Sequence, residues 1–170
     1  MRRLTRRAGR GQALVEFAMV IPIFLFMLFG IIDLGRYVYM NSTLSQAARE
    51  GARVASVEAS WVGSTDTRCG TAGGPVCPAN LAALRTDVRT AANKMVSPFP
   101  DITDAHLHIS CDATTAPTGA WTSPPHACTA RTSGGLVSVR VESEWTAITP
   151  IIGQLLGSIT SAGSATMTIN

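Results

Sequence analysis

Hydrophobic residues form one long run near the start of the chain. From Ala13 to Ile32 every residue except Glu16 is uncharged, and most are Leu, Ile, Val, Phe, Met or Ala. Twenty helical residues rise about 30 Å, which matches the thickness of the hydrocarbon core of a bilayer. The run therefore predicts a membrane-spanning helix, in which the carboxylate of Glu16 needs a partner or a place near the interface.

A helical stripe continues beyond the apolar run, with apolar and small residues at intervals of three and four positions. Its members are Tyr37, Met40, Leu44, Ala47, Ala48, Gly51, Ala52 and Ala55. One helix over residues 12–60 would be roughly 70 Å long, so less than half of it can lie in lipid. Small residues let another backbone approach closely, and this face can pack either on the chain's own outer domain or on another subunit.

The rest of the chain predicts a second helix and several strands. One helical face contains Leu81, Leu84, Val88, Ala91 or Ala92, and Met95, and the helix should end at Ser97 and Pro98. The clearest strand is GLVSVRVESEW, in which Val137, Val139 and Val141 alternate with Arg140, Glu142 and Glu144.

Weaker signals indicate a short strand over residues 106–110, a helical turn over 149–157, and renewed alternation at Ala165, Met167 and Ile169. Together these elements predict an α+β fold, in which an antiparallel sheet packs on the long helix.

Positive charge is concentrated before the apolar run. Five of the fourteen Lys and Arg residues stand in the first ten positions, as Arg2, Arg3, Arg6, Arg7 and Arg10. From Gln12 onward nine cations face eleven acids, a net charge of −2, so we expect no nucleic-acid partner. Because positively charged flanks stay in the cytoplasm, we expect an N-terminus inside and everything after Ile32 outside. No small-residue cleavage signal follows Ile32, so the helix should remain attached.

Four cysteines, Cys69, Cys77, Cys111 and Cys128, all follow the apolar run and lie among Gly, Pro, Ser and Thr. Their spacing lacks the CxxC pairs of a zinc site. An even count in an exported, loop-rich region indicates two disulfides rather than free buried thiols. Of the three pairings that four thiols allow, local spacing favours Cys69 with Cys77 and Cys111 with Cys128.

Candidate chemistry is sparse. His106 and His108 would share one face of the short strand, but two histidines without a CxxC or HExxH motif are more often surface residues than metal ligands. A nucleophilic pair of Cys111 with His108 has no supporting motif, and a disulfide would remove the thiol. We find no nucleophile elbow, phosphate loop or dinucleotide fingerprint, and we expect neither catalytic residues, a metal nor a cofactor.

The opening stretch is the most specific motif in the chain. An arginine-rich leader and Gly11 precede Gln12, and Glu16 stands fifth counted from Gln12, with Phe17 directly after it. This arrangement resembles the leader of type IV prepilins, in which a membrane peptidase cuts after the glycine and leaves the apolar helix attached.

The sequence resembles one group of these proteins more closely still. GQALVEFAMVIP and GIIDLGRYVYMNSTLSQAAREGARVAS resemble the opening of TadE-like pseudopilins of the tight-adherence (Flp-type) pilus system. The resemblance covers about the first sixty residues and recurs weakly in ITPIIGQLLGSITSAGSATM near the end, whereas residues 60–135 show no counterpart.

The resemblance implies a role for each residue of this stretch. Gly11 would precede the cut, Gln12 would become the N-terminus, Glu16 would be the acid at position five, and Phe17 its aromatic follower. Gly9 is a rival cleavage position, but it would make the acid seventh. The new amine on Gln12 would stand at i,i+4 from Glu16 and could pair with it on the same helix or on a neighbouring subunit.

Two functions are consistent with these observations. The resemblance implies a minor pseudopilin of a Tad-type pilus. Its partners would be prepilin peptidase, other pilins and pseudopilins, the inner-membrane assembly platform and the lipid bilayer. The chain would comprise a basic leader over 1–11, a long helix over 12–60 that spans the cytoplasmic membrane at 13–32, and a pilin-like extracytoplasmic α+β domain over 61–170. It could also enter the extracellular fibre.

The alternative is an uncleaved, signal-anchored envelope protein whose outer domain binds a ligand or partner.

Overall fold

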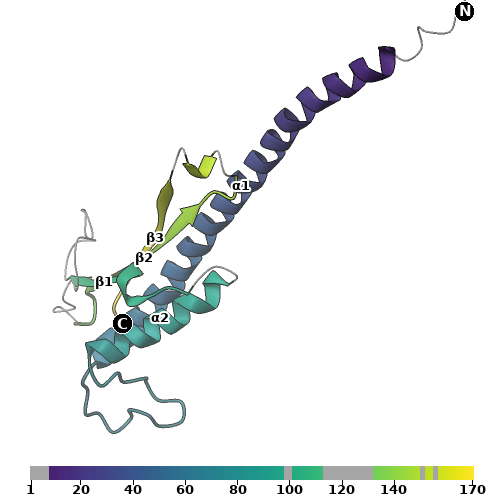
Figure 1. The fold of residues 1–170 in the computed structure, drawn as a ribbon. Helices are drawn as coiled ribbons and strands as arrows, with labels where there is room; N and C mark the ends of the chain where they lie inside the picture. Colours follow the sequence, from purple (N-terminus) through teal and green to yellow (C-terminus); the bar gives the residue numbers. More distant parts are fainter. Residues whose placement is uncertain (1–7, 98–100, 113–131, 150–151, 155–156) are drawn as a thin grey trace, which may run out of the picture. The chain divides into compact units, whose positions relative to one another are not determined.

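The computed structural model describes residues 8–97, 101–112, 132–149, 152–154 and 157–170. The helices are α1 (Ala8–Glu58) and α2 (Leu81–Val96), with 3-10 turns η1 (Ala59–Trp61) and η2 (Asp104–His106). The strands are β1 (Leu107–Asp112), β2 (Leu136–Thr146) and β3 (Ser158–Thr168). These elements form a long N-terminal helix and an antiparallel three-stranded sheet with a second helix, which confirms the predicted α+β, pilin-like arrangement (Figure 1).

The chain divides into two compact units. The apolar unit consists of Met1–Val38 and Thr146–Ile159, and it contains the N-terminal part of α1. The sheet unit consists of Tyr39–Trp145 and Thr160–Asn170, and it contains the rest of α1, α2 and most of the sheet.

Three strands in the order β1, β2, β3 form the sheet. Strand β1 pairs antiparallel with β2, so that Leu107 faces Val141 and Cys111 faces Val137. The predicted alternation of β2 is confirmed on its inner face, where Val137, Val139 and Val141 are fully buried. The opposite face is covered in part, because Ser138 of β2 is buried too and its hydroxyl bonds that of Thr166 on β3 at 2.7 Å.

The small-residue stripe of α1 forms part of the core of the sheet unit. Its buried members are Met40, Leu44, Ala47, Ala48, Ala52 and Ala55. Gly51 lies in the same stripe, where an added Cβ would be 3.2 Å from Val88 of α2 and 3.3 Å from Val139 of β2. The stripe therefore packs on α2 and β2 of the same chain, and α2 runs beside this part of α1 (Figure 1). Packing within the chain was one of the two predicted alternatives.

Helix α2 follows the predicted range closely. Its N-cap is Asn80, whose side-chain oxygen accepts a hydrogen bond of 3.0 Å from the backbone N–H of Ala83. The predicted apolar face was wrong at both ends, because Leu81 is 42% and Met95 40% exposed. Val96 is buried in place of Met95.

Two strand predictions also need correction. His106 ends the turn η2, one residue before β1 begins, so it does not share a strand face with His108. Strand β3 begins at Ser158, well before the predicted alternation at Ala165. The pattern missed its first half because, apart from Ile159, that half consists of Ser, Thr, Ala and Gly. A strand of small residues can lie directly against a helix backbone, and Gly163 does so at Leu44 of α1.

Candidate processing and assembly site

The predicted cleavage site lies on α1 within the apolar unit. Gly11 and Gln12 are exposed, and no other part of the described structure comes within 4 Å of a Cβ built on Gly11. Phe17 is also exposed. The described residues outside this part of α1 therefore leave Gly11 uncovered.

Residues 12 and 16 face the same side of α1. The side-chain amide of Gln12 donates a hydrogen bond of 3.3 Å to Oε1 of Glu16, in the i,i+4 relation that brings side chains together on a helix. A positive amine created at Gln12 would thus form close to an acid that is already in place.

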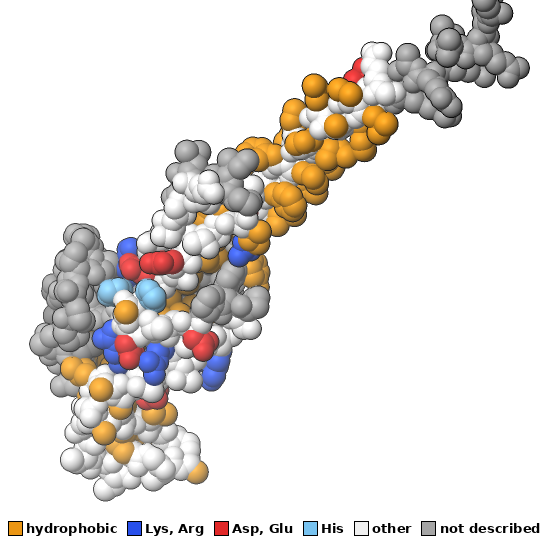
Figure 2. All heavy atoms as spheres, in the orientation of Figure 1, with side chains coloured by type: hydrophobic (Ala, Val, Ile, Leu, Met, Phe, Trp, Pro, Cys, Tyr) orange, Lys and Arg blue, Asp and Glu red, His pale blue; other side chains and the backbone are white. Residues whose placement is uncertain are grey.

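The stretch after Glu16 is the most apolar surface of the chain. The helix Gly11–Trp61 contains an 18-residue window of mean hydropathy 2.5, none of it buried within the protein. Figure 2 shows hydrophobic side chains over the visible face of this part of α1. By length and composition the helix can cross a membrane, as membrane anchors and signal sequences do.

A buried carboxylate follows this stretch directly. Asp33 is only 3% exposed and accepts hydrogen bonds from the backbone N–H groups of Ile148 and Thr149, both at 3.0 Å. The hydroxyl of Thr149 donates a third bond at 2.6 Å, and this bond is the main reason that the pKa of Asp33 lies below its usual value. Arg36 also forms an ion pair with Asp33, at 3.5 Å.

Sequence reasoning missed the contact of Asp33 with Thr149. The available signal was an acid next to an apolar run, which must find donors somewhere in the fold. Those donors could not be located from the sequence, since they lie 115 and 116 residues away.

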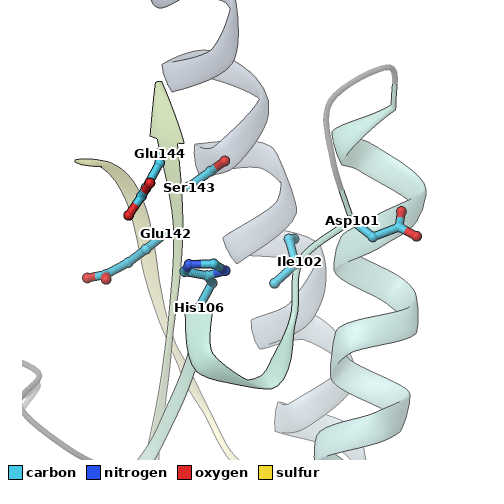
Figure 3. Close-up of a pocket in the computed structure, with 6 residues that line it drawn as sticks. All are labelled: Asp101, Ile102, His106, Glu142, Ser143 and Glu144. Carbon is cyan, nitrogen blue, oxygen red and sulfur yellow. The ribbon is translucent and has the colours of Figure 1, made fainter. Parts of the chain in front are cut away.

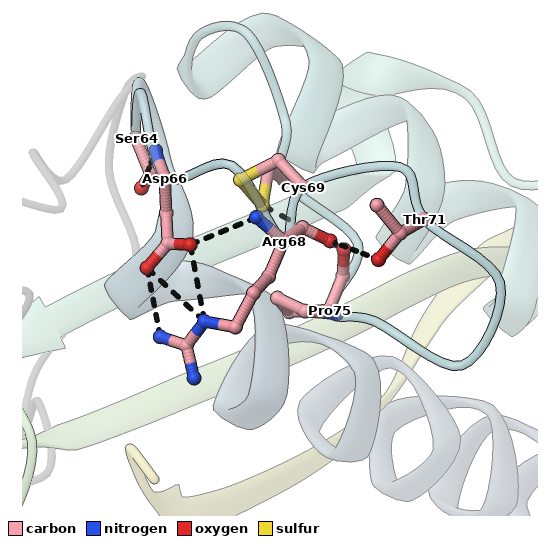
Figure 4. A network of polar contacts seen from close by, with 7 residues as sticks. Ser64, Asp66, Arg68, Cys69, Thr71 and Pro75 are labelled. Carbon is pink, nitrogen blue, oxygen red and sulfur yellow. Dashed lines mark hydrogen bonds and ion pairs between the residues drawn. A yellow bond between two sulfur atoms is a disulfide. The ribbon is translucent and has the colours of Figure 1, made fainter.

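The first predicted disulfide is present in the sheet unit. Cys69 and Cys77 are joined, and they close the loop that follows η1. Arg68, next to Cys69, donates hydrogen bonds to the carboxylate of Asp66, which lowers the pKa of Asp66 to about 2 (Figure 4). The same guanidinium lies 5.1 Å from the centre of the Trp61 ring.

The second predicted pairing stays a prediction. Cys111 is buried at the end of β1 and is itself disulfide-bonded. Cys128, its predicted partner, lies outside the described residues.

One small pocket of about 150 Å³ lies at the end of β2 in the sheet unit. It is lined by Asp101, Ile102, His106, Glu142, Ser143 and Glu144 (Figure 3). His106 Nδ1 lies 3.0 Å from the Thr103 hydroxyl, whereas His108 Nε2 lies 3.8 Å from Glu142 Oε2. No group of three or more His, Cys, Asp or Glu side chains suited to a metal occurs within the described part of the chain.

Comparison with known proteins bears on the N-terminal helix. No curated protein and no solved structure shows significant similarity to this chain. Residues 11–53 match the family described as TadE-like protein, over a range that begins at Gly11 and includes Gln12, Glu16 and Phe17. Over this N-terminal helical segment, the chain is similar to the TadE-like protein family.

Proposed function

We propose that this protein is a minor pseudopilin that acts in the assembly of a Tad-type pilus. The observation that carries the proposal is the family match over residues 11–53, which begins at Gly11 and places Glu16 fifth from Gln12. The exposed apolar surface of α1 and its packing on an α+β unit support the proposal, because both suit a membrane-stored structural subunit.

In this proposal the chain is held in the cytoplasmic membrane by residues 13–32, with the basic leader inside and the α+β domain outside. Prepilin peptidase cuts between Gly11 and Gln12. Other pilins and pseudopilins, together with the inner-membrane assembly platform, are its partners.

Glu16 has the central role in assembly. A carboxylate within an apolar helix is costly unless a positive partner offsets its charge. Cleavage creates such a partner at the amine of Gln12, and the contact of the Gln12 side chain with Glu16 supports this pairing. A neighbouring subunit can supply the same amine, which would link charge pairing to association.

The variant Glu16→Ala separates cutting from assembly. It should still insert, since loss of a charge eases entry into lipid, and it should still be cut, since Gly11 is unchanged. It should fail to co-purify with other pilins after mild detergent extraction. Asp66→Ala, which removes a carboxylate from the segment that precedes Cys69, is the matched control and should leave association intact. Normal pilus formation by Glu16→Ala would contradict the proposed role of Glu16.

A further inference from the structure

The apolar unit contains a second segment besides α1, namely residues 146–159. Asp33 binds this segment through three hydrogen bonds, to the backbone N–H groups of Ile148 and Thr149 and to the hydroxyl of Thr149. Asp33 is the first residue after the apolar run that ends at Ile32. Residues 148 and 149 are therefore fixed at the outer end of the candidate membrane span.

Thr149 is buried at this contact, but the side chain of Ile148 is 62% exposed. On α1 the neighbouring side chains Ile31 and Leu34 are similarly exposed, at 67% and 63%. The apolar surface of the span therefore continues past Asp33 onto a second segment of the chain. A soluble protein has no evident reason to leave these large apolar groups uncovered together.

The chemistry of the closing segment suits a lipid interface. No Asp, Glu, Lys or Arg occurs after Glu144, so residues 145–170 carry no charged side chain. Three backbone N–H groups that would be costly to leave unpaired in a water-poor environment have partners: those of residues 148 and 149 donate to Asp33, and that of Gly153 donates to the carbonyl of Thr149 at 2.8 Å. Arg36, which pairs with Asp33, has a long side chain that can reach the headgroups.

We propose that residues 147–149 form a second membrane contact, which Asp33 holds against the outer interface of the bilayer so that Ile148 enters the region between headgroups and acyl chains. The occupant of this apolar surface is phospholipid, because the surface is continuous with that of the span. The inference rests on the proposed membrane anchoring of α1. It adds that the outer domain is tethered to the bilayer at two points along the chain.

The test uses the full chain in vesicles of phosphatidylcholine and phosphatidylglycerol that contain lipids brominated at a shallow or a deep acyl position. A fluorophore is attached to one new cysteine, without reducing agent so that the Cys69–Cys77 disulfide stays closed. The sites are Ile148→Cys, Leu28→Cys within the span, and Val57→Cys on α1, at a position that lies beyond the span and is 46% exposed. We expect shallow bromines to quench the label at 148, deep bromines to quench that at 28, and neither to quench that at 57.

The three labelled positions separate this inference from the proposed function. A label at 28 that no bromolipid quenches would overturn both. Quenching at 28 without quenching at 148 would overturn the second contact alone. If the label at 148 is covered only at high protein density, and the cover is lost when the protein is diluted in excess lipid, the occupant is a second copy of the chain. That result would also overturn the second membrane contact.

Asp33→Ala tests the cause of the placement. Shallow quenching at 148 should then fall to the level seen at 57, while deep quenching at 28 stays unchanged and shows that the protein still inserts. Thr149→Val should give a smaller fall, because it removes one of the three hydrogen bonds and keeps the two from the backbone. Full quenching at 148 in both variants would contradict the role given to Asp33.

Discussion

Gly163 of β3 lies so close to Leu44 of α1 that a Cβ at position 163 would overlap the Leu44 carbonyl group. The Leu44 carbonyl oxygen and the backbone nitrogen of Ser45 would both lie less than 3.0 Å from this Cβ, which is closer than Cβ atoms approach other atoms in proteins. Because the clash is with helix backbone rather than with a flexible side chain, it cannot be relieved by a rotamer change. Contact between β3 and α1 in the sheet unit therefore requires glycine here.

Gly163→Ala should consequently lower the free energy of unfolding by about 2 to 3 kcal/mol. Chemical denaturation of the detergent-solubilised protein, followed by far-ultraviolet circular dichroism, measures this change. The control is Gly35→Ala on α1, where no atom lies within 4 Å of an added Cβ and alanine favours the helix. Equal stability of the two variants would contradict the close approach of β3.

Thr149→Val should loosen the segment around residue 148. The substitution removes a hydroxyl that donates to a buried carboxylate at 2.6 Å, and bonds to charged groups contribute about 1.5 to 3 kcal/mol. Hydrogen exchange of the backbone amides of Ile148 and Thr149 should accelerate accordingly. Thr149→Ser keeps the hydroxyl and should exchange at nearly the original rate, and equal acceleration in both variants would count against the contact.

Glu58, the last residue of α1, is 8% exposed, and the charge of Asp87 on α2 acts on it. Burial, with the nearby charge of Asp87 adding to it, raises the pKa of Glu58 to about 7, above its usual 4.5. The folded state thus holds this proton more tightly than the unfolded state does. The stabilisation is fully present below pH 4.5 and is lost as the pH rises to about 7.

Glu58→Gln should therefore be more stable than the parent protein at pH 8, by about 1 to 2 kcal/mol, and its stability should change less between pH 5 and pH 8. Thermal unfolding at both pH values measures the effect. Glu50→Gln, a half-exposed carboxyl on the same helix whose pKa is lowered by Arg53, should give no gain at pH 8. A parent protein that is most stable at pH 8 would refute the assignment to Glu58.

Removal of the Cys69–Cys77 disulfide by the double substitution Cys69→Ser and Cys77→Ser should lower the free energy of unfolding by about 2 kcal/mol, because the disulfide closes a short loop of the unfolded chain. The ion pair of Asp66 with Arg68 should persist, since these two residues are only two positions apart. Unfolding curves of the double variant measure the cost. Non-reducing peptide mapping of the parent protein should also join Cys111 to Cys128, and a bond from Cys69 to Cys111 would contradict both pairings.

The two helices were predictable because their buried residues recur at helical spacing, as with Leu44 and Ala48 on α1 or Leu84 and Val88 on α2. Strand β2 was predictable for the same reason at period two. The first half of β3 was not, because its strand character comes from the close approach of Gly163 to α1, which is a tertiary effect without a local pattern.

The candidate site divides in the same way. Gly11, Gln12 and Glu16 lie close together in the sequence, so their relative positions on a helix could be predicted. The contact between Gln12 and Glu16 follows from helix geometry. The donors to Asp33 could not be predicted, because the fold brings Thr149 to it from the far end of the chain.

The central claim is that the chain is a pseudopilin cut after Gly11, and the intact mass of the membrane-extracted protein tests it most directly. Removal of eleven residues from 170 leaves a mature chain of 159 residues that begins at Gln12. We expect this mass in cells that contain prepilin peptidase and the full-length mass in cells that lack it, with Gly11→Glu uncut in both. The account would be contradicted by a protein that begins at Met1 or Arg2 whether or not the peptidase is present.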